Sequence, residues 1–343
     1  ETSMAMIRAT LSALALQGAH ALPRPTVGPV VQHVGPVHHA FRFRGGGSPR
    51  SASGPALRSS RGAGVTMMTG LGVSAAVIGG FNALGCAVTL ASPEHGEKIA
   101  DLFGTGSVAV SAIAVHAMSG AGFALRPLLV TSAVAIWGVR LAGFLFYRIM
   151  KTGNDTRLSK YFETKSGTMS FWGVSALWGF MNALPQTLLC FSPFAGAALG
   201  PFGIAAAGIF ACGFLMETVA DAQKWNFKND PANTGKWCDT GLWSQCRYPN
   251  YAGELMVWTG VFGLAAGGLV GAEGLAIATL LPVCAAAMSP AFVALIILGV
   301  SGVPLAEASN EKRYGHLDAY KAYKESTPIL VPKALTTLLG MPS

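Results

Sequence analysis

Polar side chains recur at helical spacing where one apolar segment of the chain begins. The sequence from residue 247 reads RYPNYAGELMVWTG, and the positions that share one helical face are Arg247, Asn250, Tyr251 and Glu254. Pro249 is typical of the first turn of a helix. The free backbone N–H groups and the positive end of the helix dipole there attract an anion, and Arg247 adds a fork of donors. This arrangement predicts a site for a negatively charged ligand.

A second set of charged residues lies in ETVADAQKWNFK, residues 217–228. Glu217 and Asp221 are one helical turn apart, and Lys224 and Lys228 continue the same face. Two carboxylates followed by two lysines can bind a sugar hydroxyl and then phosphate groups. The alternative is an ordinary helix end at the membrane boundary, whose lysines extend toward water and pair with nearby acids.

A third charged segment follows the last long apolar run. It holds Glu307, Glu311, Lys312, Arg313 and Tyr314, and the sequence then continues as DAYKAYKESTPILVP. If the three charged segments meet at one membrane face, they form a polar pocket over a cavity that lipids can reach. Within the apolar part of the chain, Arg140 lies too deep to remain unpaired, because an isolated charge is costly in lipid.

The composition of the chain indicates the elements that must position these residues. Hydrophobic residues make up 51% of the chain and charged residues 12%, which is typical of a polytopic membrane protein. A membrane span needs about 20 apolar residues. Candidate spans lie at about 67–91, 106–125, 127–147, 169–192, 198–220, 250–271 and 274–303. The predicted fold is therefore all-α, with about seven transmembrane helices.

The distribution of basic residues predicts the orientation of these spans. Lysines and arginines gather between the third and fourth spans, between the fifth and sixth, and after the seventh. Seven spans put all three of these segments on one face of the membrane. By the positive-inside rule, this face meets the cytosol or the stroma.

Residues 1–64 differ in composition from the rest of the chain. They hold seven arginines, no lysine and a single acid, Glu1. The sequence MAMIRATLSALALQGAHALP, from Met4, suits a secretory signal, and the Arg-, Ser-, Gly- and Pro-rich remainder is typical of a transit peptide. We therefore predict an unstructured bipartite presequence for plastids over residues 1–64, followed by a membrane domain at 65–343. The alternatives are a mitochondrial presequence, a disordered basic tail, or residence in the endoplasmic reticulum.

Other ligand classes lack their sequence signatures. No basic patch with interleaved aromatic residues occurs after residue 64, so nucleic acid is not an expected partner. The six cysteines form no CxxC pair, and Cys238 and Cys246 share a polar loop without further ligands at short spacing, so no metal site is predicted. The expected partners are membrane lipids and a hydrophobic small molecule.

Three longer segments resemble the C-terminal domain of the steroid 5-alpha-reductase family, in its DUF1295 branch of membrane reductase-like proteins. They are ETVADAQKWNFK, GKWCDTGLWSQCRYPNYAGELMVWTG and EKRYGHLDAYKAYKESTPILVP, and WGVRLAGFLFYR is a less specific upstream piece. Together they span most of the chain after residue 127. The resemblance implies a seven-helix, steroid 5-alpha-reductase-like membrane fold that holds NADPH, with residues 217–332 as the cofactor-binding half.

The resemblance also implies an activity and its residues. Family members reduce an activated C=C bond in a lipid-like substrate of the steroid or enone type. Carried over by motif, Asn250 and Glu254 contact the nicotinamide end and Tyr251 lines that site, so Glu254 and Tyr251 are the candidates for catalysis. Asp221, and more loosely Glu217, meet the adenosine ribose. The further cofactor contacts implied are Lys228, Lys236, Arg247, Tyr248, Arg313 and Tyr314.

Two departures from the family pattern leave other functions open. Tyr248 stands where most relatives have histidine, and the acid–tyrosine pair that polarises the ketone in sterol-reducing members has no matching residues here. An Arg-His-Pro-x-Tyr motif followed by glutamate also marks isoprenylcysteine and phospholipid methyltransferases, which bind S-adenosylmethionine at this helix end. The missing histidine and the fuller ADxQK and DTGLW matches favour the reductase. A non-catalytic membrane subunit that keeps the nucleotide pocket is the third possibility.

Overall fold

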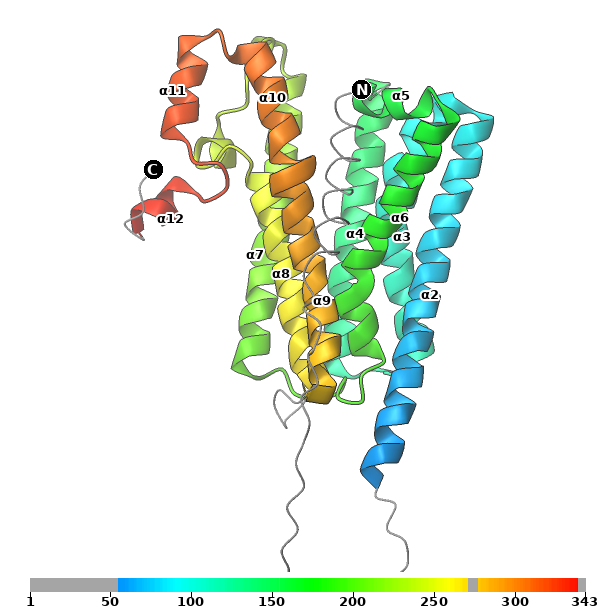
Figure 1. Ribbon diagram of the computed structural model, residues 1–343. Coiled ribbons are helices and arrows are strands. Elements are labelled where there is room, and N and C mark those ends of the chain that lie inside the picture. Colours follow the sequence, from blue (N-terminus) through cyan, green and yellow to red (C-terminus); the bar gives the residue numbers. More distant parts are fainter. Residues whose placement is uncertain (1–54, 154, 271–276, 339–343) are drawn as a thin grey trace, which may run out of the picture. The chain divides into compact units, whose positions relative to one another are not determined.

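The computed structural model describes residues 55–153, 155–270 and 277–338, and all regular elements in these ranges are helices. Figure 1 shows the long helices side by side, running alternately up and down. They are α2 (Pro55–Ala91), α3 (Pro93–Ser119), α4 (Leu125–Thr152), α6 (Lys165–Cys190), α7 (Gly200–Asn229), α8 (Pro249–Val270) and α9 (Ile277–Leu295).

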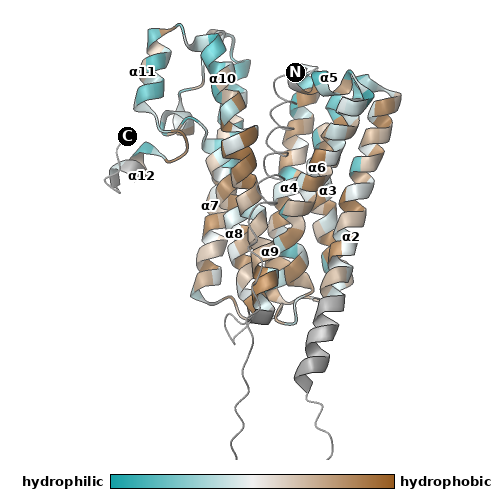
Figure 2. Ribbon diagram, in the orientation of Figure 1, coloured by the Kyte–Doolittle hydropathy of each residue, from teal (hydrophilic) through white to brown (hydrophobic). Residues whose placement is uncertain are grey.

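Shorter elements follow α4, α7 and α9. A π-helical turn joins α9 to α10, and such turns are frequent at functional sites. In Figure 2 the long helices are mostly hydrophobic, whereas α5, α10 and α11 are largely hydrophilic. The short elements are α5 (Thr156–Phe162), η1 (Pro231–Asn233), η2 (Gly241–Ser244), η3 (Ile296–Val300), α10 (Val303–Tyr314), α11 (Asp318–Ser326) and α12 (Lys333–Leu338).

Within the described residues, six helical segments are long and apolar enough to cross a membrane. They are Thr66–Ala91, Pro93–Ser119, Leu125–Thr152, Gly200–Asn229, Pro249–Val270 and Thr279–Tyr314. The predicted all-α polytopic membrane fold is therefore confirmed. The remaining predicted span corresponds to α6, which has 26 residues but carries Asn182, Gln186 and Thr187 in its C-terminal part. These polar side chains are fully buried against other helices, so the polarity of α6 faces protein rather than lipid.

The three basic segments predicted to share one membrane face do meet in the structure. Arg148 near the end of α4, Lys228 near the end of α7 and Arg313 near the end of α10 line one cavity. They meet because α4, α7 and the α9–α10 pair run in the same direction (Figure 1). Which side of the membrane this face meets remains a prediction from the positive-inside rule.

Helix α2 begins earlier than the sequence predicts. It starts at Pro55, so residues 55–64 are helical and the predicted lack of structure is wrong for them. Proline suits the first turn of a helix, and extending an existing helix costs far less than starting one. The apolar span from Thr66 therefore continues backward into the adjoining Ala-, Ser- and Arg-rich stretch. Residues 1–54, which include the predicted secretory signal, lie outside the described residues.

Glycines let α7 and α8 pack closely enough to place the polar residues. A Cβ atom on Gly253 would lie 2.6 Å from the backbone nitrogen of Glu217, and one on Gly260 would lie 2.6 Å from that of Phe210. A larger side chain at either position would force the helices apart, as at the small-residue interfaces of other membrane helices. This close approach brings the start of α8 beside the carboxylates of α7.

Candidate functional site

A buried ion-pair network joins α4 to α7. Arg140 Nη1 lies 2.8 Å from Glu217 Oε1, and Arg140 Nη2 lies 2.8 Å from Asp221 Oδ2. Trp137 Nε1 donates a hydrogen bond to Glu217 Oε2 at 3.1 Å. The guanidinium fork matches two carboxylates one helical turn apart, which is the strong geometry for such a pair. The expectation that Arg140 would be paired is confirmed.

Glu254 of α8 completes this cluster. It lies within electrostatic range of Glu217, Asp221 and Arg140. Two carboxylates therefore bind the Arg140 guanidinium in the membrane-spanning part of the protein, and a third carboxyl group lies within electrostatic range of it. The resemblance places Glu217 and Asp221 at the cofactor ribose, whereas in the structure both side chains bind Arg140. Neither lines the cavity described next.

A cavity of about 370 Å³ lies between the ends of α4, α7 and α10 and the start of α8. That volume falls within the range of small-molecule sites. Five basic side chains line it, and none of the described lining residues is acidic: Arg148, Lys224, Lys228, Arg247 and Arg313. Its aromatic lining consists of Trp237, Trp243, Tyr248, Tyr251, Tyr314, Tyr320 and Tyr323. A site with this charge attracts anions, and its rings can stack on a planar ligand.

Three of the cations form no salt bridge with a described residue, although Asp221 lies within electrostatic range of Lys224. Lys224 Nζ lies 4.5 Å from the centre of the Trp243 ring, and Lys228 Nζ donates to the Lys236 carbonyl at 2.7 Å and the Tyr314 hydroxyl at 3.0 Å. Among the described residues, none forms a salt bridge with Lys224, Lys228 or Arg313. Their charges are therefore available to a ligand.

The start of α8 is held by the C-terminal tail. The backbone N–H groups of Arg247 and Tyr248 donate to the carbonyls of Pro328 and Ile329 at 2.8 and 3.0 Å. The Tyr323 hydroxyl donates to the Trp243 carbonyl at 2.7 Å. These bonds satisfy the backbone N–H groups of Arg247 and Tyr248, just before α8. The C-terminal tail is therefore bonded to the loop that precedes α8.

Burial changes the acidity of groups in this loop. Tyr248 is 2% exposed, and burial, followed by its hydrogen bond to Glu307, raises the pKa of its hydroxyl. Burial likewise raises the pKa of the Tyr323 hydroxyl, and it raises that of the Cys246 thiol to about 11. These groups are neutral at physiological pH, so the positive charge of the cavity comes from its lysines and arginines.

The cavity contains some of the residues predicted from the sequence. Those that line it are Lys228, Arg247, Tyr248, Tyr251, Arg313 and Tyr314. Lys236 contributes its backbone carbonyl to Lys228 and Tyr314, whereas its side chain is not among the lining groups. Asn250 is also not among them, and its Oδ1 is buried without a hydrogen-bond partner in the described structure. Such an atom is costly unless a ligand or water satisfies it.

Other lining residues were not predicted as cofactor contacts. Lys224 is absent from the contacts that the resemblance implies, but its helical spacing with Lys228 already indicated it as a possible phosphate ligand, and it lines the cavity. The aromatic positions of DTGLW and DAYKAY supply Trp243, Tyr320 and Tyr323. Arg148 had no local signal, because it reaches the cavity from α4, far from the other segments in sequence.

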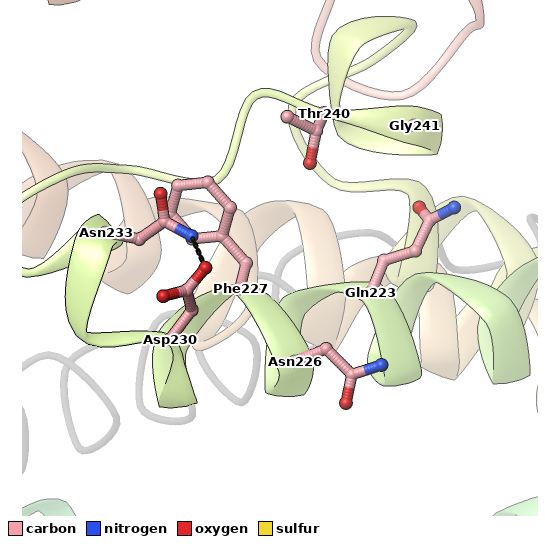
Figure 3. A pocket seen from close by; sticks show the side chains of 7 residues that line it. All are labelled: Gln223, Asn226, Phe227, Asp230, Asn233, Thr240 and Gly241. Carbon is pink, nitrogen blue, oxygen red and sulfur yellow. Dashed lines mark hydrogen bonds between the residues drawn. The ribbon is translucent and has the colours of Figure 1, made fainter.

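A second depression lies on the other face of α7 (Figure 3). Its volume is about 330 Å³, and it is lined by Gln223, Asn226, Phe227, Asp230, Asn233, Thr240 and Gly241. Asp230, the charged member of this set, accepts hydrogen bonds from Ala232 N at 2.9 Å and Asn233 Nδ2 at 3.4 Å and so caps its own turn. Its lining holds no cation, so the basic, aromatic cavity is the better candidate for an anionic ligand.

Comparisons with known proteins identify the family. The family described as "Protein of unknown function (DUF1295)" matches residues 89–327. A protein of Ustilaginoidea virens described as "Probable O-methyltransferase ustE" is 39% identical over 62 residues, which are 18% of this chain and 22% of that protein. The chain therefore matches less than a quarter of this relative, and no solved structure matches the chain significantly. Because the family match covers well over half of its length, the chain belongs to the DUF1295 family.

Proposed function

We propose that the chain is an integral membrane reductase that holds NADPH in the basic cavity and reduces an activated C=C bond of a lipid-like, enone-type substrate. The observation that carries this proposal is the lining: five basic side chains and, among the described residues, no acid. NADPH carries its negative charges on a pyrophosphate and a 2′-phosphate. A cluster of lysines and arginines is the usual partner of such groups.

The polar side chains in and around the cavity suit both the phosphate groups and the nicotinamide of NADPH. Lys224, Lys228 and Arg313 form no salt bridge in the described structure, so their side chains can bind phosphates. Trp237 lines the cavity and its Nε1 is buried without a partner there, which leaves one donor for a polar group of a ligand. Asn250 Oδ1 is also buried without a described partner, but Asn250 is not among the lining residues. Asn250 would accept from the carboxamide of the nicotinamide, as the family resemblance implies.

When bound, NADPH supplies the hydride that adds to the β carbon of the conjugated double bond, while a proton adds to the α carbon and the cofactor leaves as NADP⁺. Tyr251 lines the cavity and Glu254 lies one turn further along α8, so both remain the candidates for catalysis. Tyr314 of α10 and Tyr320 and Tyr323 of α11 line the cavity and would reduce the access of water to a bound cofactor, which strengthens charge interactions.

One wall of the cavity suits a lipid. Gly302, Leu305 and Ala306, which follow the π-helical turn, line it with apolar groups. Leu305 remains 46% exposed on a segment that is apolar enough to span the membrane. A hydrophobic substrate can therefore approach along α10 while the charged cofactor approaches from water.

A methyltransferase that uses S-adenosylmethionine is the second candidate. The description of the Ustilaginoidea virens relative favours it, although that match is short. The charge of the cavity favours it less, because S-adenosylmethionine carries a sulfonium cation and no phosphate. Five basic side chains repel a sulfonium, whereas they attract the phosphates of NADPH.

Direct binding measurements separate the candidates. The chain in lipid nanodiscs is titrated with NADPH by fluorescence, and with S-adenosylmethionine by equilibrium dialysis. We expect saturable binding of NADPH and consumption of NADPH with a lipid enone. Binding of S-adenosylmethionine without NADPH would overturn the proposal. Binding of NADPH with no turnover of lipid enones, quinones or sterols would favour the non-catalytic subunit.

A further inference from the structure

Glu307 of α10 binds two side chains of the basic cavity. Its Oε2 accepts a hydrogen bond from Arg247 Nη1 at 2.6 Å, and its Oε1 accepts one from the Tyr248 hydroxyl at 2.5 Å. The Glu307 side chain is 22% exposed, so it is largely shielded from water. Arg247 and Tyr248 line the cavity, whereas Glu307 is not among the described lining residues. The carboxylate therefore lies behind the groups that a ligand would meet.

The Arg247 guanidinium is held on two sides and free on one. Its Nε donates to the Thr327 carbonyl at 3.1 Å, and Nη1 is held by Glu307. Nη2 has no hydrogen bond to any described residue. Because Arg247 lines the cavity, Nη2 is the donor left for an anion there. A guanidinium that is already fixed loses little freedom when it binds.

The same carboxylate also fixes an aromatic wall. The Tyr248 ring stacks on the Tyr251 ring, with centroids 5.6 Å apart and planes inclined by 19°. Asn310 Nδ2, one turn beyond Glu307, approaches the Tyr248 hydroxyl at 3.4 Å. Glu307 thus orients both the charged group and the stacked rings at the start of α8.

A carboxylate close to an anion site can act in two opposite ways. By charge alone it repels the anion, so neutralising it would tighten binding. By holding the binding groups it lowers the entropy that binding costs, so neutralising it would weaken binding. The repulsion is small here, because Glu307 lies between Arg247 and Lys324, whose Nζ is 3.7 Å from its Oε2.

We propose that Glu307 is a positioning residue for the phosphate of the cofactor, and that it acts by fixing Arg247 and Tyr248. The inference rests on the proposed function, because it assumes that NADPH binds in this cavity. It states that neutralising Glu307 weakens NADPH binding and does not tighten it, a direction that the proposed function alone does not determine.

The test compares Glu307→Gln with Glu311→Gln in the full chain in nanodiscs. Both variants remove one negative charge from the same face of α10, one turn apart. Glu311 pairs with Lys324 at 2.8 Å and makes no contact with Arg247 or Tyr248. We expect Glu307→Gln to raise the Kd for NADPH about tenfold, the size of one charge-assisted hydrogen bond, and Glu311→Gln to leave it within about twofold. An unchanged or lower Kd for Glu307→Gln would refute the positioning role.

A double-mutant cycle with Arg247→Lys separates positioning from general stability. Lysine keeps the charge but has no fork to orient. If Glu307 acts mainly through Arg247, the effect of Glu307→Gln shrinks to less than about threefold in the Arg247→Lys background. An equal effect in both backgrounds would mean that Glu307 only stabilises the fold. If Glu307→Gln does not fold, Glu307→Asp against Glu311→Asp gives the same comparison with the charge retained.

The two proposals fail in different ways. If the wild-type chain does not bind NADPH, the proposed function is wrong. If the wild-type chain binds NADPH and the Glu307 and Glu311 variants behave alike, the proposed function stands and the role of Glu307 is wrong.

Discussion

Arg140 of α4 and Glu217 of α7 form a salt bridge of 2.8 Å in the membrane-spanning part of the protein. The Arg140 side chain is 16% exposed and that of Glu217 is 4% exposed. Neither charge is tolerable alone in such surroundings, so the pair holds two helices that otherwise touch little. It also keeps the carboxylates of α7 turned away from the basic cavity, whose lining then stays cationic.

Replacing Arg140 should therefore destabilise the whole fold. Arg140→Met leaves Glu217 and Asp221 without their salt-bridge partner, and we expect a loss of about 3–5 kcal/mol in the free energy of unfolding. Thermal unfolding in detergent measures this change, with Arg140→Met/Glu217→Gln as the partly compensated control. If the single variant unfolds at the wild-type temperature, the network has no structural role.

Asn250→Ala should remove NADPH binding without destabilising the protein. Its Oδ1 is buried without a described partner, so removing the side chain deletes an unsatisfied polar atom instead of a hydrogen bond. We expect unchanged thermal stability and a Kd for NADPH raised at least about tenfold. Thr259→Ala is the control, because its hydroxyl bonds only to the Leu255 carbonyl of its own helix. Loss of stability together with binding would instead favour a packing role for Asn250.

Lys224 should contribute to affinity through its charge. Lys224→Met should raise the Kd for NADPH about tenfold, because this lysine lines the cavity and forms no salt bridge with a described residue, although Asp221 lies within its electrostatic range. Raising the salt concentration should weaken binding to the wild type more than binding to the variant. Lys321→Met is the matched control, since Lys321 is exposed and pairs with Asp318 on α11. Equal salt dependence of the wild type and Lys224→Met would exclude a phosphate contact at Lys224.

Thiol labelling should report the closure of the loop before α8. Cys246 is fully buried and its pKa is raised to about 11, so its reactive thiolate is scarce near pH 7. In a variant that keeps Cys246 alone, labelling by a water-soluble maleimide should be slow at pH 7. The rate should rise with pH until about pH 11, as the thiolate fraction grows, and unfolding should remove the protection. Rapid labelling of the folded chain at pH 7 would show that the tail does not cover this loop.

The presequence can be tested apart from the membrane domain. Residues 1–64 fused to a fluorescent protein should direct it to plastids bounded by extra membranes, because the segment joins a signal-like part to a transit-like part. Arg-to-Ala changes in the second part should retain the fusion at the endoplasmic reticulum. Accumulation in mitochondria would favour the mitochondrial alternative.

The fold was largely predictable because its signals are local. Runs of apolar residues locate the long helices. Among the long helices that the structure describes, α6 alone is too polar in composition to be recognised as a membrane span, and its polar residues face protein. The site was predictable in part for the same reason. Arg247, Tyr248 and Tyr251 lie within a few positions of one helix start, and all three line the cavity.

Other features depend on which helices meet. The family resemblance predicted Glu217 and Asp221 beside the cofactor. In the structure, Arg140, 77 positions before Glu217, donates hydrogen bonds to both carboxylates. Arg148 and Glu307 approach the start of α8 from α4 and α10, and neither carries a local sign of that role.

The sequence by itself determined an all-helical membrane chain and a helix start that carries Arg247, Tyr248 and Tyr251, because hydropathy and helical spacing are properties of neighbouring residues. The tertiary structure alone decided how the charges are divided. It pairs Glu217 and Asp221 with Arg140 and leaves the cavity lining basic, because charges far apart in the sequence come into contact only when the helices pack.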